Sequence, residues 1–493
     1  MTAIGIDLGT SNTAVAHVKD GAPHTLCDAA GRRLIPSIVS FHPSGTVIVG
    51  DAAKMRRFND APNTVTGAKR LMGRTWGSPE LIEMQKRISY PLREGKNRTV
   101  RAFLRGELYS IPELSAFVLR KAKAWAEEAL GETVTEAVIT VPANFNELQR
   151  QATKLAGELA GLEVLRVLNE PTAAALAYNH VAPPTSDELI AVYDFGGGTF
   201  DLTVLRMSER ALRVRATAGD MFLGGDDIDI AIATKMAETY LEHHYYDPRA
   251  DPEVFARVRV AAERLKIALS TDLEATATLN ELMYGQGGKA INWTFRMTRA
   301  QIDALLDPFI ERSMKVCKEA IGMLKVAPGD FDRVVLVGGT TLSPRVRQRV
   351  TDFFGREPVP GVDPEEAVAL GAAISGTIPV ARKQKAAAQP VAAAPAPAAE
   401  AATAEDDYPV SEAYGEAGVV GPDGLFAQTG KAQKARSRWN AATWGWLAWA
   451  GVGVAIGLAT AGVIGLLRYR QLRREASPPA VEAPPPPAPP AAP

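Results

Sequence analysis

The chain has 493 residues, of which 46% are hydrophobic and 23% charged, and its formal net charge is −1. This length allows two or three domains with large cores, and the balanced charge gives no indication of nucleic-acid binding. The two cysteines, Cys27 and Cys317, are too few for a disulfide framework or a metal cage, and they fit a reducing compartment. The N-terminus runs into a strand pattern without a signal peptide, so we expect the folded N-terminal part to be cytoplasmic.

The first predicted element is a strand, a tight turn and a second strand, in the sequence Ile4-Gly-Ile-Asp-Leu-Gly-Thr-Ser-Asn-Thr-Ala-Val-Ala16. The same pattern recurs as Val192-Tyr-Asp-Phe-Gly-Gly-Gly-Thr-Phe-Asp-Leu-Thr-Val-Leu205, which predicts a β-hairpin. Glycine turns allow close approach of another group and present N–H donors to an anion. One such turn is also typical of an ordinary exposed hairpin. Two of them suggest a duplicated fold that holds a phosphate between its halves.

Carboxylates flank both glycine turns. Asp7 precedes the first turn, and Asp194 and Asp201 bracket the second. Carboxylates repel a bare phosphate, so their presence suggests a metal ion between them and it. Mg²⁺ prefers one or two carboxylates, several waters and phosphate oxygens.

Strands and helices alternate along the intervening and following sequence. A capping box at Ser110 opens one predicted helix, and further helices are expected over 146–159, 230–246, 252–269, 299–324 and 363–373. Buried strands are expected over 135–141 and 164–168, and another strand begins at Val334. This alternation predicts an α/β domain over residues 1–378.

The composition changes abruptly after this domain. Residues 379–438 are rich in Ala and Pro and then acidic, which predicts a disordered linker, and residues 469–493 form a Pro-rich tail. Between them the stretch from Ala441 to Leu467 has no charged residue. At about 1.5 Å per residue it would span roughly 40 Å, enough to cross the ~30 Å hydrocarbon layer with tilt.

We therefore expect a single transmembrane helix over 439–468, with tryptophans crowded at its start as interface residues. The alternative is a buried core helix, but linker and tail leave no core to cover it. Basic residues are balanced on the two sides, so the positive-inside rule does not set the orientation. The predicted phosphate site and the absence of a signal peptide favour a cytoplasmic N-terminal domain on a single-pass membrane protein.

Together, these segments resemble the 70-kilodalton heat-shock chaperone family. The resemblance covers about residues 2–378, the nucleotide-binding domain of that family. It rests on segments in family order: 4–16, 67–74, 138–144, 165–178, 192–205, 219–229, 263–270, 334–344 and 363–373. It implies the two-lobed actin-like and sugar-kinase ATPase fold, with four subdomains and ATP or ADP in the cleft.

The resemblance also implies roles for individual residues. The phosphates would be held by Gly9, Thr10, Ser11 and Asn12 from one lobe and by Gly196, Gly197, Gly198 and Thr199 from the other. Hydrated Mg²⁺, and K⁺ as in the family, would be held by Asp7, Glu170, Asp194 and Asp201. The ribose, adenine and α-phosphate would contact Gly224, Gly225, Glu263, Lys266, Ser270, Gly338 and Gly339.

Lys69 would position the attacking water, and Pro142 and Arg150 would form the family's nucleotide-dependent switch. Outside this joint pattern, Lys69 is more typical of a solvated surface lysine, and Glu263 with Lys266 of a surface i,i+3 pair.

Three departures from the family pattern stand out. Leu342 occupies the position of an arginine that stacks on adenine, and losing that cation–π contact weakens ATP binding up to about thirtyfold unless Arg264 or another group replaces it. Met221 and Phe222 replace Thr-His. The acidic-leucine interdomain linker and the peptide-binding domain are not recognised after Val380.

We therefore expect a membrane-anchored, chaperone-type hydrolase that slowly converts ATP to ADP and phosphate, with the protein-folding and stress-response role of the family and an unidentified client or co-chaperone. The alternatives are a membrane scaffold that binds nucleotide without hydrolysing it, an actin-like filament protein and, least favoured, a small-molecule kinase.

Overall fold

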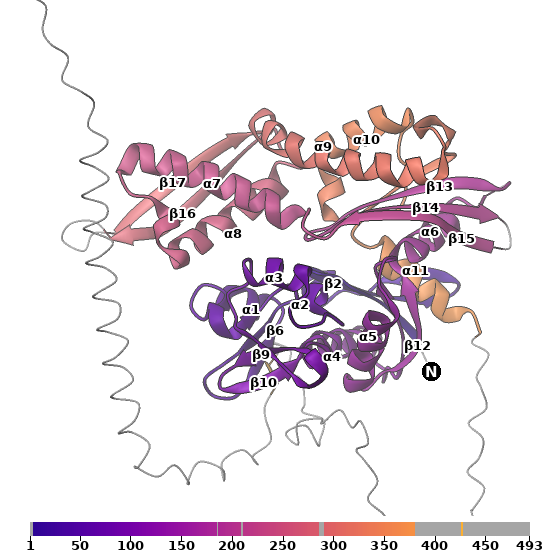
Figure 1. The fold of residues 1–493 in the computed structure, drawn as a ribbon, viewed down its shortest axis with the longest axis horizontal. Coiled ribbons are helices and arrows are strands. Elements are labelled where there is room, and N and C mark those ends of the chain that lie inside the picture. The colour runs from indigo at the N-terminus through magenta and orange to yellow at the C-terminus, as the bar shows by residue number, and fades with distance from the viewer. Residues whose placement is uncertain (1–2, 185, 209–210, 285–289, 380–424, 427–493) are drawn as a thin grey trace, which may run out of the picture. The chain divides into compact units, whose positions relative to one another are not determined.

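Two mixed β-sheets form the centre of the described chain (Figure 1). This computed structural model describes residues 3–184, 186–208, 211–284, 290–379 and 425–426. The first sheet has the order β12-β11-β1-β2-β3, with β4 paired to β2, and the second has the order β15-β14-β13-β18. We call residues 3–169, around the first sheet, the N-terminal half, and residues 188–354, around the second, the C-terminal half.

The strands of the first sheet are β1 (Ala3–Leu8), β2 (Asn12–Lys19), β3 (Ala22–Thr25), β4 (Leu34–Pro36), β11 (Glu136–Val141) and β12 (Glu163–Asn169). Those of the second are β13 (Glu188–Phe195), β14 (Phe200–Ser208), β15 (Ala211–Asp220) and β18 (Arg333–Val337). Each sheet contains one of the two predicted hairpins, β1–β2 and β13–β14, and both pair antiparallel. The hairpin prediction and its recurrence in both halves are confirmed.

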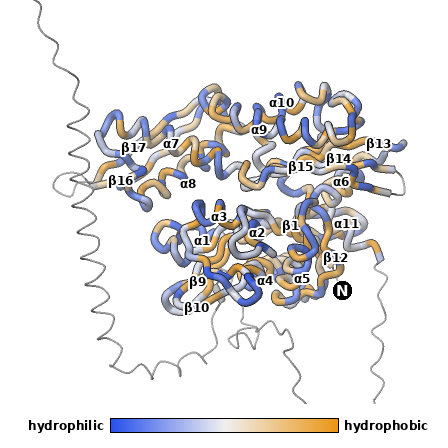
Figure 2. The backbone as a smooth tube through the Cα atoms, viewed as in Figure 1, coloured by the Kyte–Doolittle hydropathy of each residue, from blue (hydrophilic) through white to orange (hydrophobic). Residues whose placement is uncertain are grey.

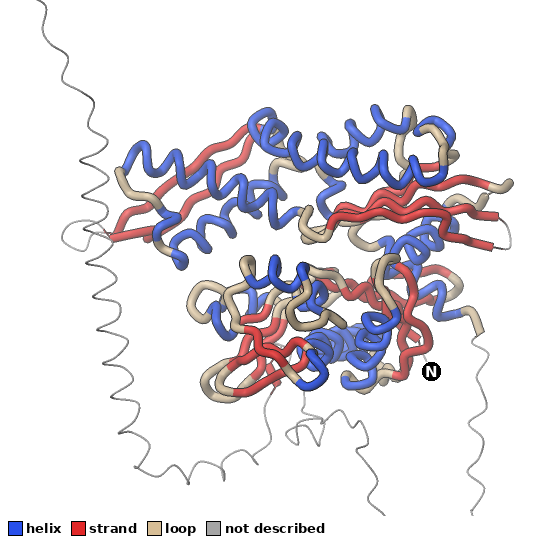
Figure 3. Tube along the Cα trace, in the orientation of Figure 1, coloured by secondary structure: helices blue, strands red, loops and turns tan. Residues whose placement is uncertain are grey.

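Strand β13 is covered on both faces, which explains its continuous apolar sequence. Ala191, Tyr193 and Phe195 pack in one core, whereas the alternating residues Ile190 and Val192 pack in another. The first core includes side chains of α7 (Gly225–His244), α8 (Pro252–Ala268), α9 (Arg299–Leu324) and α10 (Pro344–Phe354). The second includes side chains of α6 (Glu170–Val181) and α11 (Ala367–Thr377). Helices thus enclose this sheet from both sides (Figure 3).

Helices α6 and α11 pack against each other at very short range. A Cβ on Gly371 would lie 1.6 Å from the carbonyl oxygen of Ala173, so only glycine fits at this crossing. On the first sheet, α11 packs its Ala369 and Ala373 against Ala14 and Ala16 of β2. Small residues therefore allow one helix to contact both its helical neighbour and the first sheet.

Further helices and strands complete both halves. The N-terminal half also contains α1 (Asp51–Arg56), α2 (Ala68–Leu71), α3 (Pro79–Gln85), α4 (Ile111–Leu130), α5 (Glu147–Leu159), β5 (Val39–Phe41), β6 (Val47–Val49), β7 (Thr64–Val65), β8 (Leu92–Glu94), β9 (Val100–Leu104) and β10 (Glu107–Ser110). The C-terminal half contains the β-ribbon of β16 (Glu274–Tyr284) and β17 (Ala290–Thr298). Hydrophobic and hydrophilic residues alternate along α7, α8 and α9, as expected for helices that cover a sheet with one face (Figure 2).

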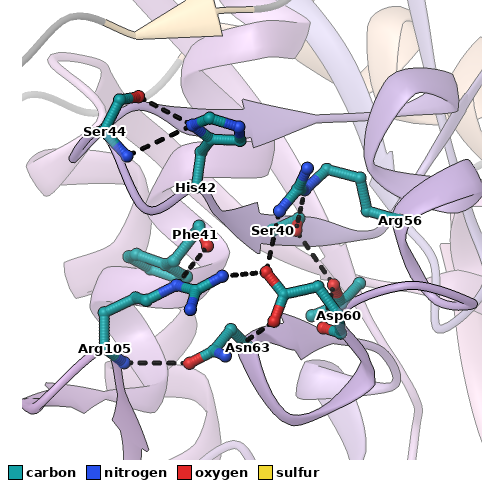
Figure 4. A network of polar contacts seen from close by, with 9 residues as sticks. Ser40, Phe41, His42, Ser44, Arg56, Asp60, Asn63 and Arg105 are labelled. Atoms are coloured by element: carbon teal, nitrogen blue, oxygen red, sulfur yellow. Dashed lines mark hydrogen bonds and ion pairs between the residues drawn. The ribbon is translucent and has the colours of Figure 1, made fainter.

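A polar network around Asp60 holds the β5–α1 region together (Figure 4). The carboxylate accepts hydrogen bonds from Arg56 (2.7 Å), Asn63 (2.7 Å) and Arg105. Arg56 also donates to Ser40 of β5, and Arg105 donates to the carbonyl of Phe41. These contacts fix α1, which carries Lys54, against the sheet that contains β6, β5 and β7.

Most predicted elements are present with small shifts at their ends. The capping box is confirmed at Ser110, whose backbone N–H donates to Glu113 at 2.6 Å. The helix expected from Asp363 is wrong at its start, because α11 begins at Ala367. Asp363 instead accepts a hydrogen bond from the N–H of Glu365 at 3.0 Å, which makes a turn before the helix.

Most of the predicted C-terminal architecture lies outside the described residues. This applies to the transmembrane helix over 439–468, the tail over 469–493 and nearly all of the linker over 379–438. Within the linker, Leu425–Phe426 forms β19, which pairs antiparallel with β6. No helix within the described ranges combines the length and hydrophobicity needed to cross a membrane.

Candidate functional site

The two predicted glycine turns face each other. A Cβ on Gly197 would lie 2.4 Å from the Oγ of Ser11, and one on Gly198 would lie 2.8 Å from the Cγ2 of Thr10. A side chain at either position would therefore force Ser11, Thr10 or Arg70 to shift. The β1–β2 turn, which also contains Gly9 and the exposed Asn12, therefore contacts the β13–β14 turn of the other half.

Predicted carboxylates converge beside these turns. Asp194 and Asp201 are cross-strand partners at the closed end of the β13–β14 hairpin, Asp7 lies near the end of β1, and Glu170 is the first residue of α6. Burial raises the pKa of Asp7 to about 6, with Glu170 adding to this effect. Burial and repulsion from Glu170 also raise the pKa values of Asp194 and Asp201 well above the usual value. The surroundings therefore do not fully neutralise these carboxylates when they are ionised.

Lys69 supplies the positive charge in this cluster. Its Nζ lies 2.5 Å from the Oε1 of Glu170, and the Lys69 side chain is only 9% exposed. Burial alone would lower the pKa of Lys69, but Glu170, Asp7 and Asp194 raise it above the usual value. Lys69 is therefore a buried, charged group at the site and not a solvated surface lysine.

Neighbouring polar side chains that the sequence did not single out support two of the carboxylates. Thr140 of β11 donates to Asp7 at 3.1 Å, and Asn144 donates to Asp201 at 3.3 Å. Thr140 reaches the site because β11 pairs with β1, and Asn144 lies in the segment that follows β11.

Arg70 is a second basic residue that sequence reasoning missed. Its guanidinium donates to the carbonyl of Gly198 in the other half and lies 3.9 Å from Asp226. The side chain is only 8% exposed. The Lys69-Arg70 pair was the available signal, but a dibasic pair on its own is equally typical of a surface.

A second pair of glycine loops supports the β13–β14 turn. The N–H groups of Gly225 and Asp226 donate to the carbonyls of Gly196 (3.0 Å) and Gly197 (2.7 Å). A Cβ on Gly224 would lie 2.5 Å from the Gly197 carbonyl oxygen. On the other side, Gly338 has a φ of 84°, and a Cβ there would lie 2.5 Å from the Phe195 carbonyl oxygen.

The predicted ribose and adenine residues lie on or beside α8, but Glu263 and Lys266 do not form an i,i+3 pair. Glu263 binds Lys54 of the N-terminal half at 2.6 Å. Lys266 binds Asp229 at 2.8 Å and donates to the carbonyl of Gly225 at 3.0 Å. Burial raises the pKa of Asp229 to about 6 despite this contact. Ser270 donates to the Lys266 carbonyl.

The remaining predicted positions lie around these loops. Gly339 begins a short 3-10 helix, Gly339–Leu342, at whose end Leu342 is 41% exposed. Thr199 accepts a hydrogen bond from the N–H of Gly196 at 3.0 Å through its carbonyl, which closes the β13–β14 turn. Arg264 is exposed on α8.

A cavity of about 640 Å³ borders this site. Predicted residues on its wall are Thr10, Ser11, Asn12 and Glu263. Lys69 and the carboxylate cluster lie outside its lining. The candidate chemistry therefore lies at these charged groups and glycine turns, beside the cavity and not on its wall.

Pro142 and Arg150 connect to the cluster through Asn169. Pro142 follows β11, and its carbonyl accepts from the N–H of Phe145 at 3.1 Å. Arg150 donates to the Phe145 carbonyl at 3.2 Å and also to the side chain of Asn169. Asn169 directly precedes Glu170, so these predicted switch residues form a continuous path to the partner of Lys69.

The described residues contain no group of three or more His, Cys, Asp or Glu side chains arranged to hold a metal ion directly. The family model described as Hsp70 protein matches residues 3–388, well over half of the chain. The chain belongs to the Hsp70 family. It is a chaperone-type ATP-binding protein, and its α/β structure agrees with the actin-like ATPase fold of Hsp70 proteins.

Proposed function

We propose that this Hsp70 protein slowly hydrolyses ATP to ADP and phosphate, using the site between the two glycine turns. The observation that supports this most strongly is the buried Lys69–Glu170 pair, which lies among Asp7, Asp194 and Asp201. Phosphoryl transfer depends on positioning and charge neutralisation more than on a strong base. The site offers both.

The glycine turns bind the phosphates in this proposal. Thr10 and Ser11 contribute hydroxyl and backbone donors from one half, and the backbone N–H groups of 196–199 contribute from the other. Arg70, next to Gly198, adds positive charge on the same side. Because these donors come from both halves, a bound phosphate would link the two.

Lys69 orients the attacking water. Its ammonium donates hydrogen bonds to the water oxygen and to the γ-phosphate, and Glu170 keeps it in place and charged. A fixed positive charge in a buried site stabilises the charge that develops in the transition state.

The uncompensated carboxylates fit a cation. Asp7, Glu170, Asp194 and Asp201 would hold hydrated Mg²⁺, and K⁺ beside it, through the water molecules of these ions. When bound, Mg²⁺ neutralises negative charge on the phosphate oxygens. Thr140 and Asn144 keep two of these carboxylates oriented.

The nucleoside lies along α8 in this proposal. Glu263, Lys266 and Ser270 contact ribose and adenine, and Gly224, Gly225, Gly338 and Gly339 border the α-phosphate and ribose. The Arg150–Asn169 contact would transmit the state of Glu170 to the surface, where an unidentified client or co-chaperone binds.

Phosphate release by the purified chain with Mg-ATP tests the hydrolysis. We expect turnover by the wild type and its loss in Lys69→Ala and Asp194→Ala. If ATP binds but neither substitution changes phosphate release, hydrolysis is not the function of this site and a nucleotide-dependent scaffold is favoured. Pulldown of membrane-extracted protein with ATP and then with ADP identifies a nucleotide-sensitive partner.

Membrane anchoring through the stretch from Ala441 to Leu467 is also part of the proposal, and it rests on the hydrophobic sequence. The test compares the full chain with a variant that lacks 439–468. We expect only the full chain to remain in the membrane fraction after a carbonate wash. Recovery of the full chain in the soluble fraction would contradict the anchor.

A further inference from the structure

Arg87 joins the two halves at a place where the chain departs from the family pattern. It lies just beyond α3 in the N-terminal half, where its N–H donates to the carbonyl of Met84 at 2.9 Å. Its guanidinium carbon lies 4.8 Å from the centre of the Phe222 ring in the C-terminal half. Its Nη1 lies 2.8 Å from the Oδ1 of Asp227 in the same half. A single side chain therefore makes a cation–π contact and an ion pair with the opposite half.

Asp227 connects this contact to the nucleotide site. While one oxygen binds Arg87, the other accepts a hydrogen bond from the N–H of Gly224 at 3.0 Å. Gly224 precedes α7, whose first two N–H groups donate to the carbonyls of Gly196 and Gly197. Arg87 is thus separated from the β13–β14 glycine turn by Asp227 and the first turn of α7.

Met221, the residue before Phe222, reinforces the same junction. Arg74 of the N-terminal half donates to the sulfur of Met221, with 2.9 Å between Nη2 and Sδ. Both residues that replace Thr-His, Met221 and Phe222, therefore contact arginines across the halves. This gives a physical role to a departure that the sequence left unexplained.

We propose that Arg87 is a positioning residue that latches residues 221–227, up to the first turn of α7, to the N-terminal half and slows the release of bound nucleotide. The inference rests on the proposed nucleotide site. Arg87 and Asp227 both line the cavity beside that site and come from opposite halves, so a separation of the halves at this cavity breaks their ion pair. The 32% exposed Arg87 and the 15% exposed Asp227 are partly shielded from water, which strengthens their attraction.

Dissociation of a fluorescent ADP analogue, chased with excess unlabelled ADP, tests the latch. We expect Arg87→Ala to dissociate about three- to tenfold faster than the wild type, and Phe222→Leu, which keeps an apolar side chain without the ring, about two- to fivefold faster. Arg87→Lys retains the charge but loses the planar guanidinium, so its rate should fall between those of wild type and Arg87→Ala.

Lys154→Ala is the control, because Lys154 pairs with Glu158 of its own helix in the N-terminal half and does not line the cavity. We expect its dissociation rate to equal that of the wild type. In the double variant Arg87→Ala/Phe222→Leu, the acceleration should be smaller than the product of the two single effects. Thermal melting of each variant verifies folding.

The outcomes separate this inference from the function on which it rests. If the wild type does not bind the ADP analogue, the proposed nucleotide site fails and the latch with it. If the wild type binds the analogue but folded Arg87→Ala releases it at the wild-type rate, only the latch is overturned. Equal acceleration by Lys154→Ala, or independent effects in the double variant, would also overturn it.

Discussion

Lys69 and Glu170 form an ion pair inside the protein, with 2.5 Å between Nζ and Oε1 and no more than a tenth of either side chain exposed. They are 101 residues apart in the chain. Lys69 lies in the four-residue helix α2, and Glu170 begins α6, so the pair depends on the packing of both elements. The removal of either partner leaves a buried charge without its counterion.

Lys69→Ala should therefore impair both stability and activity. We expect a loss of about 3 kcal/mol in the free energy of unfolding, because Glu170 remains buried and unpaired. Phosphate release should fall at least about 100-fold. Denaturant unfolding and a phosphate-release assay measure the two effects. Lys154→Ala, which breaks a half-exposed pair with Glu158, is the control and should change stability by less than about 0.5 kcal/mol.

Asp194→Asn should stabilise the nucleotide-free protein while it weakens Mg-ATP binding. Burial and the negative charges of Glu170, Asp201 and Asp7 disfavour the charged form of Asp194. A neutral amide relieves this repulsion, so we expect a gain of about 1–2 kcal/mol in the free energy of unfolding without ligand.

Thermal melting with and without Mg-ATP measures the stability of the ligand-free protein and its stabilisation by the ligand. The wild type should gain stability from Mg-ATP and lose that gain on EDTA addition, whereas Asp194→Asn should show little gain at all. Asp187→Asn, at an exposed position, should behave like the wild type. A full Mg-ATP response in Asp194→Asn would exclude this carboxylate from the metal site.

Leu342→Arg should tighten ATP binding. Leu342 is 41% exposed at the end of the Gly339–Leu342 turn and offers no charge to a bound adenine. A guanidinium at this position would add a cation–π contact and lower the Kd for ATP up to about thirtyfold. Isothermal titration gives the Kd, and Leu342→Gln controls for polarity without charge. Equal affinities in the two variants would show that adenine does not lie against this residue.

Asp229 should make stability depend on pH in a defined window. The pKa of its carboxyl is raised by burial from 3.8 to about 6 in the folded protein. The folded state therefore holds this proton more tightly than the unfolded state. The stability that the proton contributes is present below about pH 4 and is lost as the pH rises to about 6.

The contribution amounts to at most about 3 kcal/mol, because one pKa unit corresponds to 1.36 kcal/mol. Urea unfolding of wild type and Asp229→Asn at several pH values isolates it. We expect the difference between the two free energies of unfolding to change between pH 4 and 6 and to stay constant above that range. A difference that is constant throughout would show that Asp229 has an ordinary pKa.

The sequence alone determined the local elements on which the site is built. Alternating or continuous apolar residues around glycine turns set the β1–β2 and β13–β14 hairpins, because only glycine tolerates close backbone approach. The capping box at Ser110 sets the start of α4 at the next residue. These features depend on neighbours in the chain and were predicted correctly. The predicted start of α11 at Asp363 was wrong, because the Asp363 side chain forms a turn before the helix instead of a cap.

The tertiary structure alone decided which charges meet. From the sequence, Lys69 and Lys266 could equally be exposed surface lysines. The packing of α2, α6 and α8 instead pairs them with Glu170 and Asp229. Arg87 and Asp227 are 140 residues apart and meet only because the two halves come together. Local sterics are encoded by adjacent residues, whereas an ion pair between distant residues depends on the packing of all the elements that carry them.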